Sequence, residues 1–184
     1  MTLKQKLSKY IQSFNYAFFN IVINLPPDDS FSNSYIRTAI ARNFGLKCGK
    51  KCLIRKHIYV EHHKNVVIGD NTFIFGQSYI DALGKVTIGN NVRIAPQIMI
   101  VTGTHERGDP GQRAGNTFGE PVIIGDGCWI GARVTITSGV TIGESSIISA
   151  GSIVQRSMPP NSLIAGNPAR PISRLDQKDS PEQS

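Results

Sequence analysis

The sequence has few cysteines, few charged residues and no long apolar run, and each shortage excludes a class of protein. Three cysteines in a chain without a recognisable secretion signal predict a reduced, cytoplasmic protein, and 184 residues can build a core without disulfides. The most apolar stretch, residues 14–25, is twelve residues long and contains three asparagines, whereas a membrane-spanning helix needs about 20 residues. With 40% apolar and 18% charged residues, the chain is predicted to be neither an integral membrane protein nor disordered.

Leucine is scarce too, and β-branched residues take its place. The chain has 8 Leu against 24 Ile and 11 Val. Branching at Cβ restricts these side chains in helices and suits the pleated surface of a strand. The composition therefore predicts a β protein rather than a helical bundle.

Acidic residues are scarce mainly in the first third of the chain. Residues 1–64 contain eleven Lys and Arg against three acids, whereas residues 65–184 contain nine against ten. The overall charge of +7 therefore belongs to the N-terminal region. No nucleic-acid-binding motif accompanies it, so we expect no nucleic acid partner. Two interpretations remain: a solvated face beside a helical cap, or weak peripheral association with an anionic membrane.

A six-residue repeat organises the remainder of the chain. Fourteen of its fifteen positions are Ile or Val, although these two types account for only 35 of the 184 residues. A period of six is neither helical nor a simple alternation; it describes a short strand, a turn and a new strand, with one aliphatic side chain per unit directed into a shared interior. The positions are Cys48, Ile54, Val60, Ile68, Ile74, Ile80, Ile88, Ile94, Ile100, Ile124, Ile130, Ile136, Ile142, Ile148 and Val154.

The neighbours of these positions repeat as well. Glycine often follows directly, as a backbone that turns tightly or adopts a positive φ would require, and small or β-branched side chains occupy the position four residues on. Three units make one triangular coil, so the repeat predicts about five stacked coils over residues 46–172, with a loop excursion at 101–121. Pro159 and Pro160 are expected to end the stack, because neither donates to a backbone ladder.

Two segments lie outside the predicted coils. Residues 1–45 are predicted to form a helical extension, because apolar residues follow helical spacing from Leu3 until Pro26-Pro27 ends the first helix. A second short helix is expected to have Ser32 or Asn33 as its N-cap and to end at Gly45. Residues 173–184 are predicted to be a polar C-terminal tail.

Three segments carry a resemblance to a known family. They are Thr102-Gly-Thr-His-Glu106, Ile124-Gly-Asp-Gly-Cys-Trp-Ile-Gly-Ala132 and Ala165-Gly-Asn-Pro-Ala-Arg-Pro171. With the hexapeptide repeat, they resemble the left-handed β-helix O-acetyltransferases over roughly residues 48–172. The spacing of residues 79–84 before residues 86–89 is most similar to the colanic-acid or exopolysaccharide type. The resemblance implies an all-β, left-handed parallel β-helix and a homotrimer with active sites between adjacent subunits.

His105 is the candidate general base. It lies at the start of the excursion, where a rigid coil fixes the ends of a long loop. Transfer of an acetyl group from a thioester to a hydroxyl requires the hydroxyl to lose its proton, and imidazole, with an ordinary pKa of about 6.5, suits this task. The segment also matches the catalytic histidine of the family. Glu106 or a backbone carbonyl is expected to fix the tautomer, and Glu106 is also a candidate substrate contact or simply an exposed residue.

Acetyl-CoA is the donor that the resemblance implies. Matching the family motif position by position predicts backbone contacts from two alanines and phosphate contacts from the C-terminal coils, where guanidinium groups can form paired charge-assisted hydrogen bonds. The alternative for each arginine is a solvated surface charge. The candidate donor-binding residues are Ala132, Ala150, Gln155, Arg156 and Arg170, with Arg174 assisting.

On the acceptor side, the sequence departs from the small-sugar members of the family. The resemblance places Phe75 and Leu83 where the galactoside and maltose acetyltransferases have an Asn and an Asp. A larger glycan is therefore expected in place of a small free sugar. Asp81 is the candidate contact to its hydroxyl, although it can equally be a turn residue.

The remaining histidines, His57, His62 and His63, lie near the first coil. A zinc-dependent γ-type carbonic anhydrase would need three protein ligands and an open position, with one histidine upstream of a close pair. Here the cluster precedes the single His105, so the order is reversed. We expect no metal and predict that these three are surface residues.

The cysteines and the single tryptophan have structural interpretations. Cys48, Cys52 and Cys128 occupy repeat slots and are expected to be small buried fillers. Trp129 is expected either to form a wall of the donor groove or to pack between coils.

The expected function is acetyl-CoA-dependent O-acetylation of a sugar hydroxyl in an exopolysaccharide or its lipid-linked precursor. One alternative is an acetyltransferase for a small sugar, an antibiotic or an amine. The alternative of another class is a non-catalytic trimeric β-helix scaffold.

Overall fold

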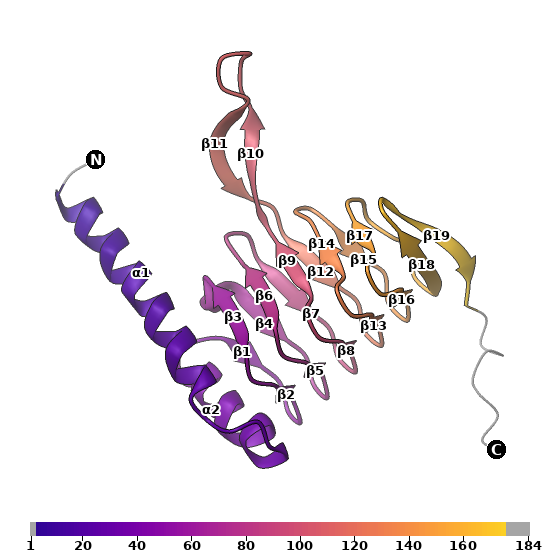
Figure 1. Ribbon diagram of the computed structural model, residues 1–184, viewed down its shortest axis with the longest axis horizontal. Coiled ribbons are helices and arrows are strands. Elements are labelled where there is room, and N and C mark those ends of the chain that lie inside the picture. Colours follow the sequence, from indigo (N-terminus) through magenta and orange to yellow (C-terminus); the bar gives the residue numbers. More distant parts are fainter. Residues whose placement is uncertain (1–2, 176–184) are drawn as a thin grey trace.

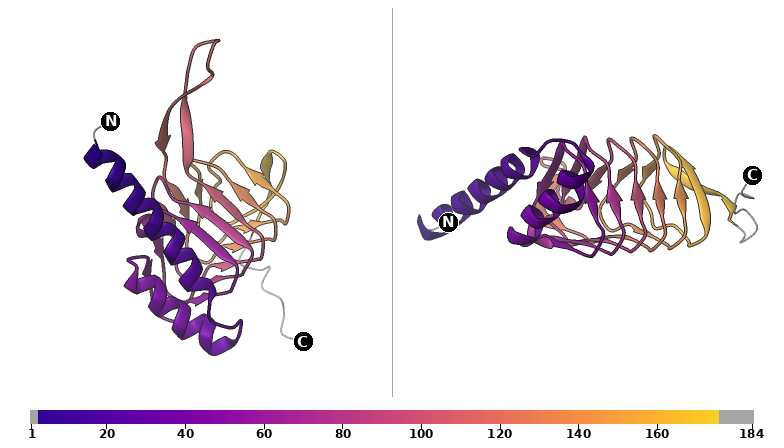
Figure 2. Two further views of the ribbon diagram at one scale, coloured as in Figure 1. Left: turned by 60° about the vertical axis from the view of Figure 1, so that its left-hand side comes forward. Right: turned by 90° about the horizontal axis from the view of Figure 1, so that it is seen from below.

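The computed structural model describes residues 3–175, which form a parallel β-helix with two helices at its N-terminal end (Figure 1). Each coil passes through three sheets, here named A, B and C in chain order, and the sheets enclose one apolar interior (Figure 2). Five strands in sheet A and five in sheet C confirm the prediction of about five triangular coils.

The strands are short, and each pairs with its equivalents one coil before and after. Sheet A contains β1 (Lys47–Cys48), β4 (Val66–Ile68), β7 (Val86–Ile88), β12 (Val122–Ile124) and β15 (Thr141–Ile142). Sheet B contains β2 (Leu53–Ile54), β5 (Phe73–Ile74), β8 (Arg93–Ile94), β13 (Trp129–Ile130), β16 (Ile147–Ile148), β18 (Ser162–Gly166) and the antiparallel β19 (Ala169–Arg174). Sheet C contains β3 (Ile58–Glu61), β6 (Ser78–Asp81), β9 (Met99–Val101), β14 (Thr135–Ile136) and β17 (Ile153–Val154).

The six-residue repeat forms the core as predicted. Its fourteen Ile and Val positions are all at most 3% exposed, and Cys48 is half-buried. Four residues after most of these positions the side chain is buried as well, for example at Cys52, Thr72 and Cys128, whereas Lys64 is exposed. Because each coil repeats the same inward pattern, every aliphatic side chain lies above and below its equivalent, which gives the dense packing of a solenoid interior.

The glycines after the repeated positions serve close approach rather than a positive φ. A Cβ at Gly69 would lie 2.6 Å from the backbone of Gly89 in the next coil, so a side chain has no space there. The positive φ falls two residues later, for example at Asn71 and Asn91 (φ 52° and 56°). Asparagine tolerates this conformation better than most residues do, so the positive-φ alternative in the sequence prediction is wrong for these glycines.

The N-terminal extension is helical, as predicted, but the residue that caps its second helical segment differs from the prediction. The helices are α1 (Leu3–Asn24), a π-helical turn η1 (Ser32–Ile36) and α2 (Arg37–Asn43), and a 3-10 turn η2 (His63–Asn65) follows β3. Ser32 and Asn33 lie inside the helical segment. The Asp29 carboxylate instead accepts hydrogen bonds from the N–H and the hydroxyl of Ser32, both at 2.8 Å.

Two asparagines of α1 complete the free edge of sheet C. Asn20 accepts a hydrogen bond from Val60 N–H (2.8 Å) and donates one to the Val60 carbonyl (2.9 Å). Asn24 pairs in the same way with Ile58, accepting at 3.2 Å and donating at 2.7 Å. Asn20 and Asn24 are four residues apart, which is about 6.0 Å along a helix, and Ile58 and Val60 are two residues apart, which is about 6.6 Å along a strand. The two asparagines are therefore spaced to pair with both strand residues. The helix thereby closes the edge that β3 would otherwise present to another strand.

Arg37 connects the end of α1 to the second helical segment. Its side chain is 0% exposed. Its Nε donates to the Ile23 carbonyl at 3.1 Å, and its Nη atoms donate to the side chain of Asn33 and to the Pro26 carbonyl. These carbonyls lie at the C-terminal end of α1, where backbone acceptors lack partners within the helix and a cation is favourable.

The C-terminal boundary differs slightly from the prediction. Strand β19 continues through Arg174, so Ser173 and Arg174 belong to the β-helix rather than to a tail. The predicted tail beyond 175 lies outside the described residues. Among residues 3–175, none of the helices has the length and apolar character needed to cross a bilayer.

Candidate active site

The excursion predicted as a loop is an antiparallel hairpin. Strands β10 (Gly103–Arg107) and β11 (Ala114–Gly119) pair with His105 opposite Thr117. At the tip, Asp109 Oδ1 accepts hydrogen bonds from the N–H groups of Gly111 and Gln112, at 2.9 and 3.2 Å. The hairpin leaves the corner between sheets C and A and projects well beyond the coil that carries it (Figures 1 and 2).

His105 has a defined tautomer. Its Nδ1 lies 3.1 Å from the Gly115 carbonyl, which can only accept, so Nδ1 carries the proton. Thr117 Oγ1 lies 3.3 Å from the same nitrogen. The lone pair of the neutral ring is therefore on Nε2, and the side chain is exposed on the hairpin. This arrangement leaves Nε2 able to remove a proton from a hydroxyl.

Glu106 does not orient His105. Its Oε2 accepts a hydrogen bond from Asn116 Nδ2 at 3.0 Å across the hairpin. Of the two alternatives for fixing the tautomer, the structure therefore has the backbone carbonyl. His105, Glu106, Arg107 and Arg113 together line an open hollow on the hairpin, which places two cations beside the imidazole.

Asp81 holds the base of the hairpin. Its Oδ2 accepts a hydrogen bond from Gly103 N–H at 2.8 Å, and its Oδ1 accepts one from Leu83 N–H at 3.0 Å. Gly103 begins β10, two residues before His105. Asp81 is thus a turn residue in this structure, and any contact to an acceptor would use its remaining lone pairs.

Asp81 also belongs to a small polar cluster with Glu61 and His62. One ligand atom from each of the three lies within 4.8 Å of the others. His62 Nδ1 is 3.6 Å from Asp81 Oδ1, and Tyr79 donates a hydrogen bond to Glu61 at 3.0 Å. Burial, together with this carboxylate, raises the pKa of Tyr79 to about 12. Glu61 and His62 line a cavity of about 540 Å³ between α1 and the first coils, with Leu83 on its wall.

The prediction that all three remaining histidines lie at the surface is correct for His57 and wrong for His63. His57 is exposed, and the ring of His62 is half-buried. His63 is 0% exposed, and its Nε2 lies 3.0 Å from the Phe44 carbonyl. Its ring stacks on Phe19, with centroids 4.2 Å apart. Packing of α1 over the first coil, which the repeat does not encode, buries this side chain.

The candidate donor-binding residues gather on the C-terminal coils but not at one point. Ala132 and Ala150 lie one coil apart at the corner between sheets B and C, where Gly151 N–H donates to the Ala132 carbonyl at 2.8 Å. Gln155 and Arg156 are exposed after β17, at the corner between sheets C and A from which the hairpin also leaves. Within the described chain, no hydrogen bond or ion pair joins these four residues to the hairpin.

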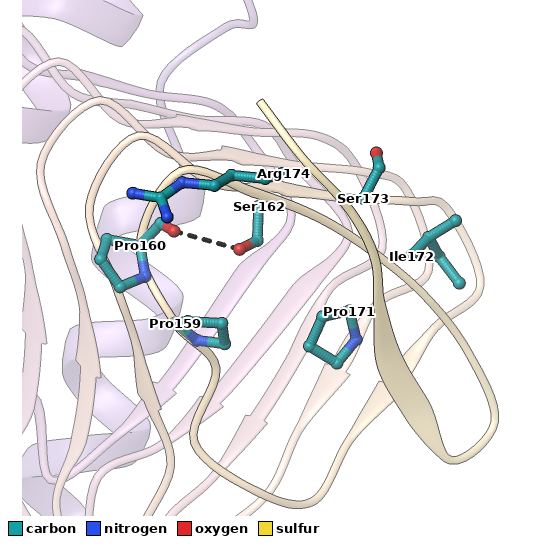
Figure 3. A pocket seen from close by; sticks show the side chains of 7 residues that line it. All are labelled: Pro159, Pro160, Ser162, Pro171, Ile172, Ser173 and Arg174. Atoms are coloured by element: carbon teal, nitrogen blue, oxygen red, sulfur yellow. Dashed lines mark hydrogen bonds between the residues drawn. The ribbon is translucent and has the colours of Figure 1, made fainter. Parts of the chain in front are cut away.

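The two remaining arginine candidates lie on β19. Arg170 is exposed, and its Nη1 donates to the carbonyl of its neighbour Ala169 at 2.8 Å. Arg174 lines an open pocket with Pro159, Pro160 and Pro171 at the C-terminal end of the β-helix (Figure 3). In that pocket the Ser162 hydroxyl donates to the Pro160 carbonyl at 3.0 Å.

Two of the three cysteines are buried as predicted. Cys52 and Cys128 are buried, Cys48 is half-buried, and burial raises the pKa of Cys48 to about 11, which keeps the thiol protonated. Trp129 does not pack in the interior. It is 56% exposed on the outer face of sheet B, in register with Arg93 and Ile147.

The partners of His105 across the hairpin were not predicted from the sequence. Gly115 and Thr117 lie ten and twelve residues further along the chain, and no repeat connects them to His105. Asp109-Pro110-Gly111 is a turn signal at the centre of the excursion, with a polar segment of similar length on each side. That signal was sufficient to predict a hairpin and a pairing near His105.

Comparison with known proteins agrees with this geometry. The family described as "Hexapeptide repeat of succinyl-transferase" matches residues 121–156. YJL218W of Saccharomyces cerevisiae, named as an acetyltransferase, is 37% identical over 84% of this chain and 76% of its own length. The galactoside O-acetyltransferase of Escherichia coli is 34% identical over 78% and 70% of the two chains. WcaF of Escherichia coli, an acetyltransferase named for colanic acid biosynthesis, is 32% identical over 72% and 71%.

Solved structures extend the similarity to nearly the whole chain. A galactoside acetyltransferase in complex with coenzyme A has a TM-score of 0.82 at 29% identity, covering 94% of this chain and 85% of that one. The hexapeptide-repeat acetyltransferase VCA0836 of Vibrio cholerae, complexed with acetyl coenzyme A, has a TM-score of 0.80 at 30% identity, covering 91% and 88%. The chain therefore belongs to the hexapeptide-repeat acetyltransferases.

Proposed function

We propose that this protein is an acetyl-CoA-dependent O-acetyltransferase that modifies a sugar hydroxyl of an exopolysaccharide or its lipid-linked precursor, with His105 as general base. The observation that carries the proposal is the hydrogen bond from His105 Nδ1 to the Gly115 carbonyl, which leaves Nε2 unprotonated on an exposed hairpin. A scaffold without chemistry would not need this tautomer or this exposure.

The proposed reaction is a direct transfer. As the acceptor oxygen attacks the thioester carbonyl, His105 Nε2 takes the hydroxyl proton. The tetrahedral intermediate then collapses, the C–S bond breaks, and the imidazolium returns the proton to the departing thiolate. The products are the acetyl ester and free CoA thiol. A covalent acetyl-enzyme is not required, and the buried thiols of Cys52 and Cys128 are poor candidates for one.

Donor binding is proposed on the C-terminal coils. CoA and acetyl-CoA are the ligands named for two structural neighbours that cover about nine-tenths of this chain. In this chain, Ala132 and Ala150 lie at one corner in successive coils, which supports the proposal that their backbone groups contact an extended arm. The exposed Arg156 and Arg170 would meet the phosphates.

The active site is proposed to form between subunits of a homotrimer. The hairpin projects beyond its own coil (Figure 1). The element order places the proposed donor contacts at Ala132 and Ala150 at a different corner from the one that carries His105. An adjacent subunit would bring its donor edge to the hairpin and complete the site.

The general-base role can be tested by replacing His105 with Ala in the full-length protein. Thiol release from acetyl-CoA in the presence of acceptor should fall about 10²–10⁴-fold, the usual contribution of a general base. The matched control is His57→Ala, because His57 is an exposed histidine on the first coil, away from the hairpin. Sedimentation of both variants should show the wild-type oligomer. Near-normal turnover of His105→Ala would refute the mechanism.

The acceptor is tested by comparing classes of substrate. Lipid-linked oligosaccharides and polysaccharide fragments should be acetylated more efficiently than free galactosides or maltose. A second candidate, acetylation of a small sugar, is supported by relatives named for galactosides and maltose. Against it, the resemblance places the apolar Phe75 and Leu83 where the small-sugar enzymes have an Asn and an Asp that contact the acceptor. Efficient acetylation of free galactosides with none of the glycans would favour the second candidate.

A further inference from the structure

Helix α1 has two apolar faces on opposite sides. Phe19 and Ile23 are 0% exposed and pack into the core. At 100° per residue, a second set of apolar side chains covers roughly 100° of the helix circumference, centred opposite to Phe19 and Ile23. This outer face consists of Leu3, Leu7, Tyr10, Ile11, Phe14, Phe18, Ile21 and, just beyond the helix, Leu25.

The outer face is largely exposed, and only its Phe18 ring contacts another described aromatic ring outside α1, that of Phe44, with centroids 5.9 Å apart. The exposed fractions on this face run from 48% at Phe18 to 83% at Leu3. The N-terminal part of α1 extends away from the β-helix in all three views, so the coils do not cover it (Figures 1 and 2). Phe14 and Phe18 pack only one turn apart, with ring centroids at 6.2 Å. A continuous apolar stripe of this size on a helix indicates a partner.

Charge identifies the kind of partner. Helix α1 contains no acidic residue. Exposed Lys4 and Lys6 fall just outside the two edges of the outer face, one on each side. Lysines in these positions can lay their methylenes along an apolar phase while the ammonium groups remain in a polar, anionic layer. Residues 1–64 as a whole carry eleven cationic against three acidic residues.

We infer that α1 binds in the plane of an anionic bilayer, with the outer face in the boundary between headgroups and acyl chains. The apolar stripe is flanked by lysines on a helix that is too polar over its remaining surface to cross a bilayer, which is the pattern of an interfacial helix. A second copy of the chain is the less suitable occupant, because its own first 64 residues carry the same positive surplus and would repel Lys4 and Lys6. The inference is independent of the acetyl transfer, since it needs neither donor nor acceptor.

Vesicle co-sedimentation of the full-length protein tests this inference. The probes are vesicles of phosphatidylcholine alone and vesicles with about 30% phosphatidylglycerol. The wild-type protein should bind the anionic vesicles and remain in solution with the neutral ones. Phe14→Glu places a carboxylate in the outer face and should weaken binding at least about tenfold. The matched control, Ser8→Glu, makes the same charge change at an exposed position outside that face and should weaken binding only about fivefold, the electrostatic share alone.

A second variant keeps the test valid if Phe14→Glu is poorly folded. Lys4→Gln with Lys6→Gln removes the flanking charges and should weaken binding about fivefold per lysine, an effect that high salt reproduces in the wild type. The inference is overturned if the wild-type protein ignores anionic vesicles, or if Phe14→Glu binds as well as Ser8→Glu. It is also overturned if Phe14→Glu dissociates the oligomer while vesicle binding is unchanged, because the outer face would then be a subunit interface.

Discussion

The stacked coils and the helical N-terminal extension, called the N-terminal segment below, share one apolar core, but different kinds of contact stabilise the two regions. In the coil, one buried aliphatic position recurs every six residues, and each side chain meets its own equivalent in the neighbouring coils. In the N-terminal segment, single polar side chains make the decisive contacts: Asn20 and Asn24 on strand β3, and Arg37 on the end of α1. The repeated contacts should therefore let the coils tolerate single substitutions, whereas the N-terminal segment depends on a few polar side chains that no neighbouring residue replaces.

Energetics follow from that contrast. Losing one methyl group from a coil interior leaves the neighbouring layers to relax around a small space. Removing a polar group in the N-terminal segment leaves buried donors or acceptors without partners, which costs the full desolvation of each. A conservative substitution should therefore lower the free energy of unfolding more in the N-terminal segment than in the coils.

Arg37→Lys should produce the largest loss of stability. Lysine keeps the charge but cannot donate simultaneously to Ile23, Pro26 and Asn33, because those acceptors fit the fork of a guanidinium. The free energy of unfolding should fall by about 2–4 kcal/mol in urea titrations, the value expected for losing charge-assisted bonds in a buried site. The coil control, Ile130→Val, should cost about 1 kcal/mol. A smaller loss for Arg37→Lys than for Ile130→Val would contradict the comparison.

Asn20→Ala should have the next largest effect. It removes the partners of Val60 N–H and the Val60 carbonyl, both on the free edge of sheet C. We expect a loss of about 2 kcal/mol in the free energy of unfolding. Amide hydrogen exchange gives a local measurement, because the Val60 amide should lose its protection while the Ile80 amide in the next strand keeps its own.

Asn15→Ala is the matched control for that variant. Asn15 is half-buried on the same helix and is not among the residues that pair with β3. Its replacement should change stability by less than about 0.5 kcal/mol. Unchanged protection of Val60 in Asn20→Ala would show that the helix does not close the edge.

The coils were predictable from the sequence, whereas the contacts of the N-terminal segment were not. A period of six is visible in one sequence, and Ile54, Ile74 and Ile94 lie in the core where that period places them. The contact between Asn20 and Val60 joins residues 40 positions apart with no repeat to align them. Asn20 and Asn24 were visible as polar interruptions in an apolar helix, but only the position of β3 gives them a function.

The candidate site is predictable in its residue types and less so in its geometry. His105 was identifiable because its proposed role depends on the chemistry of imidazole and on a short local segment. The group that orients it depends on pairing across the hairpin, so Gly115 rather than Glu106 holds the imidazole. The donor contacts remain proposals for the same reason, since the proposed site between subunits would depend on an arrangement of chains that no local pattern in one sequence specifies.

The smallest expected effect is a pH dependence that originates in the N-terminal segment. Burial lowers the pKa of His63 below the ordinary 6.5 of imidazole, and the nearby Lys64 and His62 lower it further. His63 Nδ1 is buried and has no hydrogen-bond partner among residues 3–175, so protonation would create an unpaired charge beside Phe19 and Phe44. As the pH falls through 6.5, the unfolded chain therefore binds a proton at His63 before the folded chain does. The stability that the neutral, buried His63 contributes is lost progressively between pH 6.5 and the lower folded-state pKa.

Replacing His63 with Gln should reduce that dependence, because the amide can still donate to the Phe44 carbonyl but does not titrate. Melting temperatures measured between pH 7 and 5 should fall less steeply for His63→Gln than for the wild type. His57→Gln, at an exposed position of the same coil, should follow the wild-type curve. If the exposed histidine changed the slope and the buried one did not, the acid sensitivity would belong to the surface of the coil rather than to the helix that packs on it.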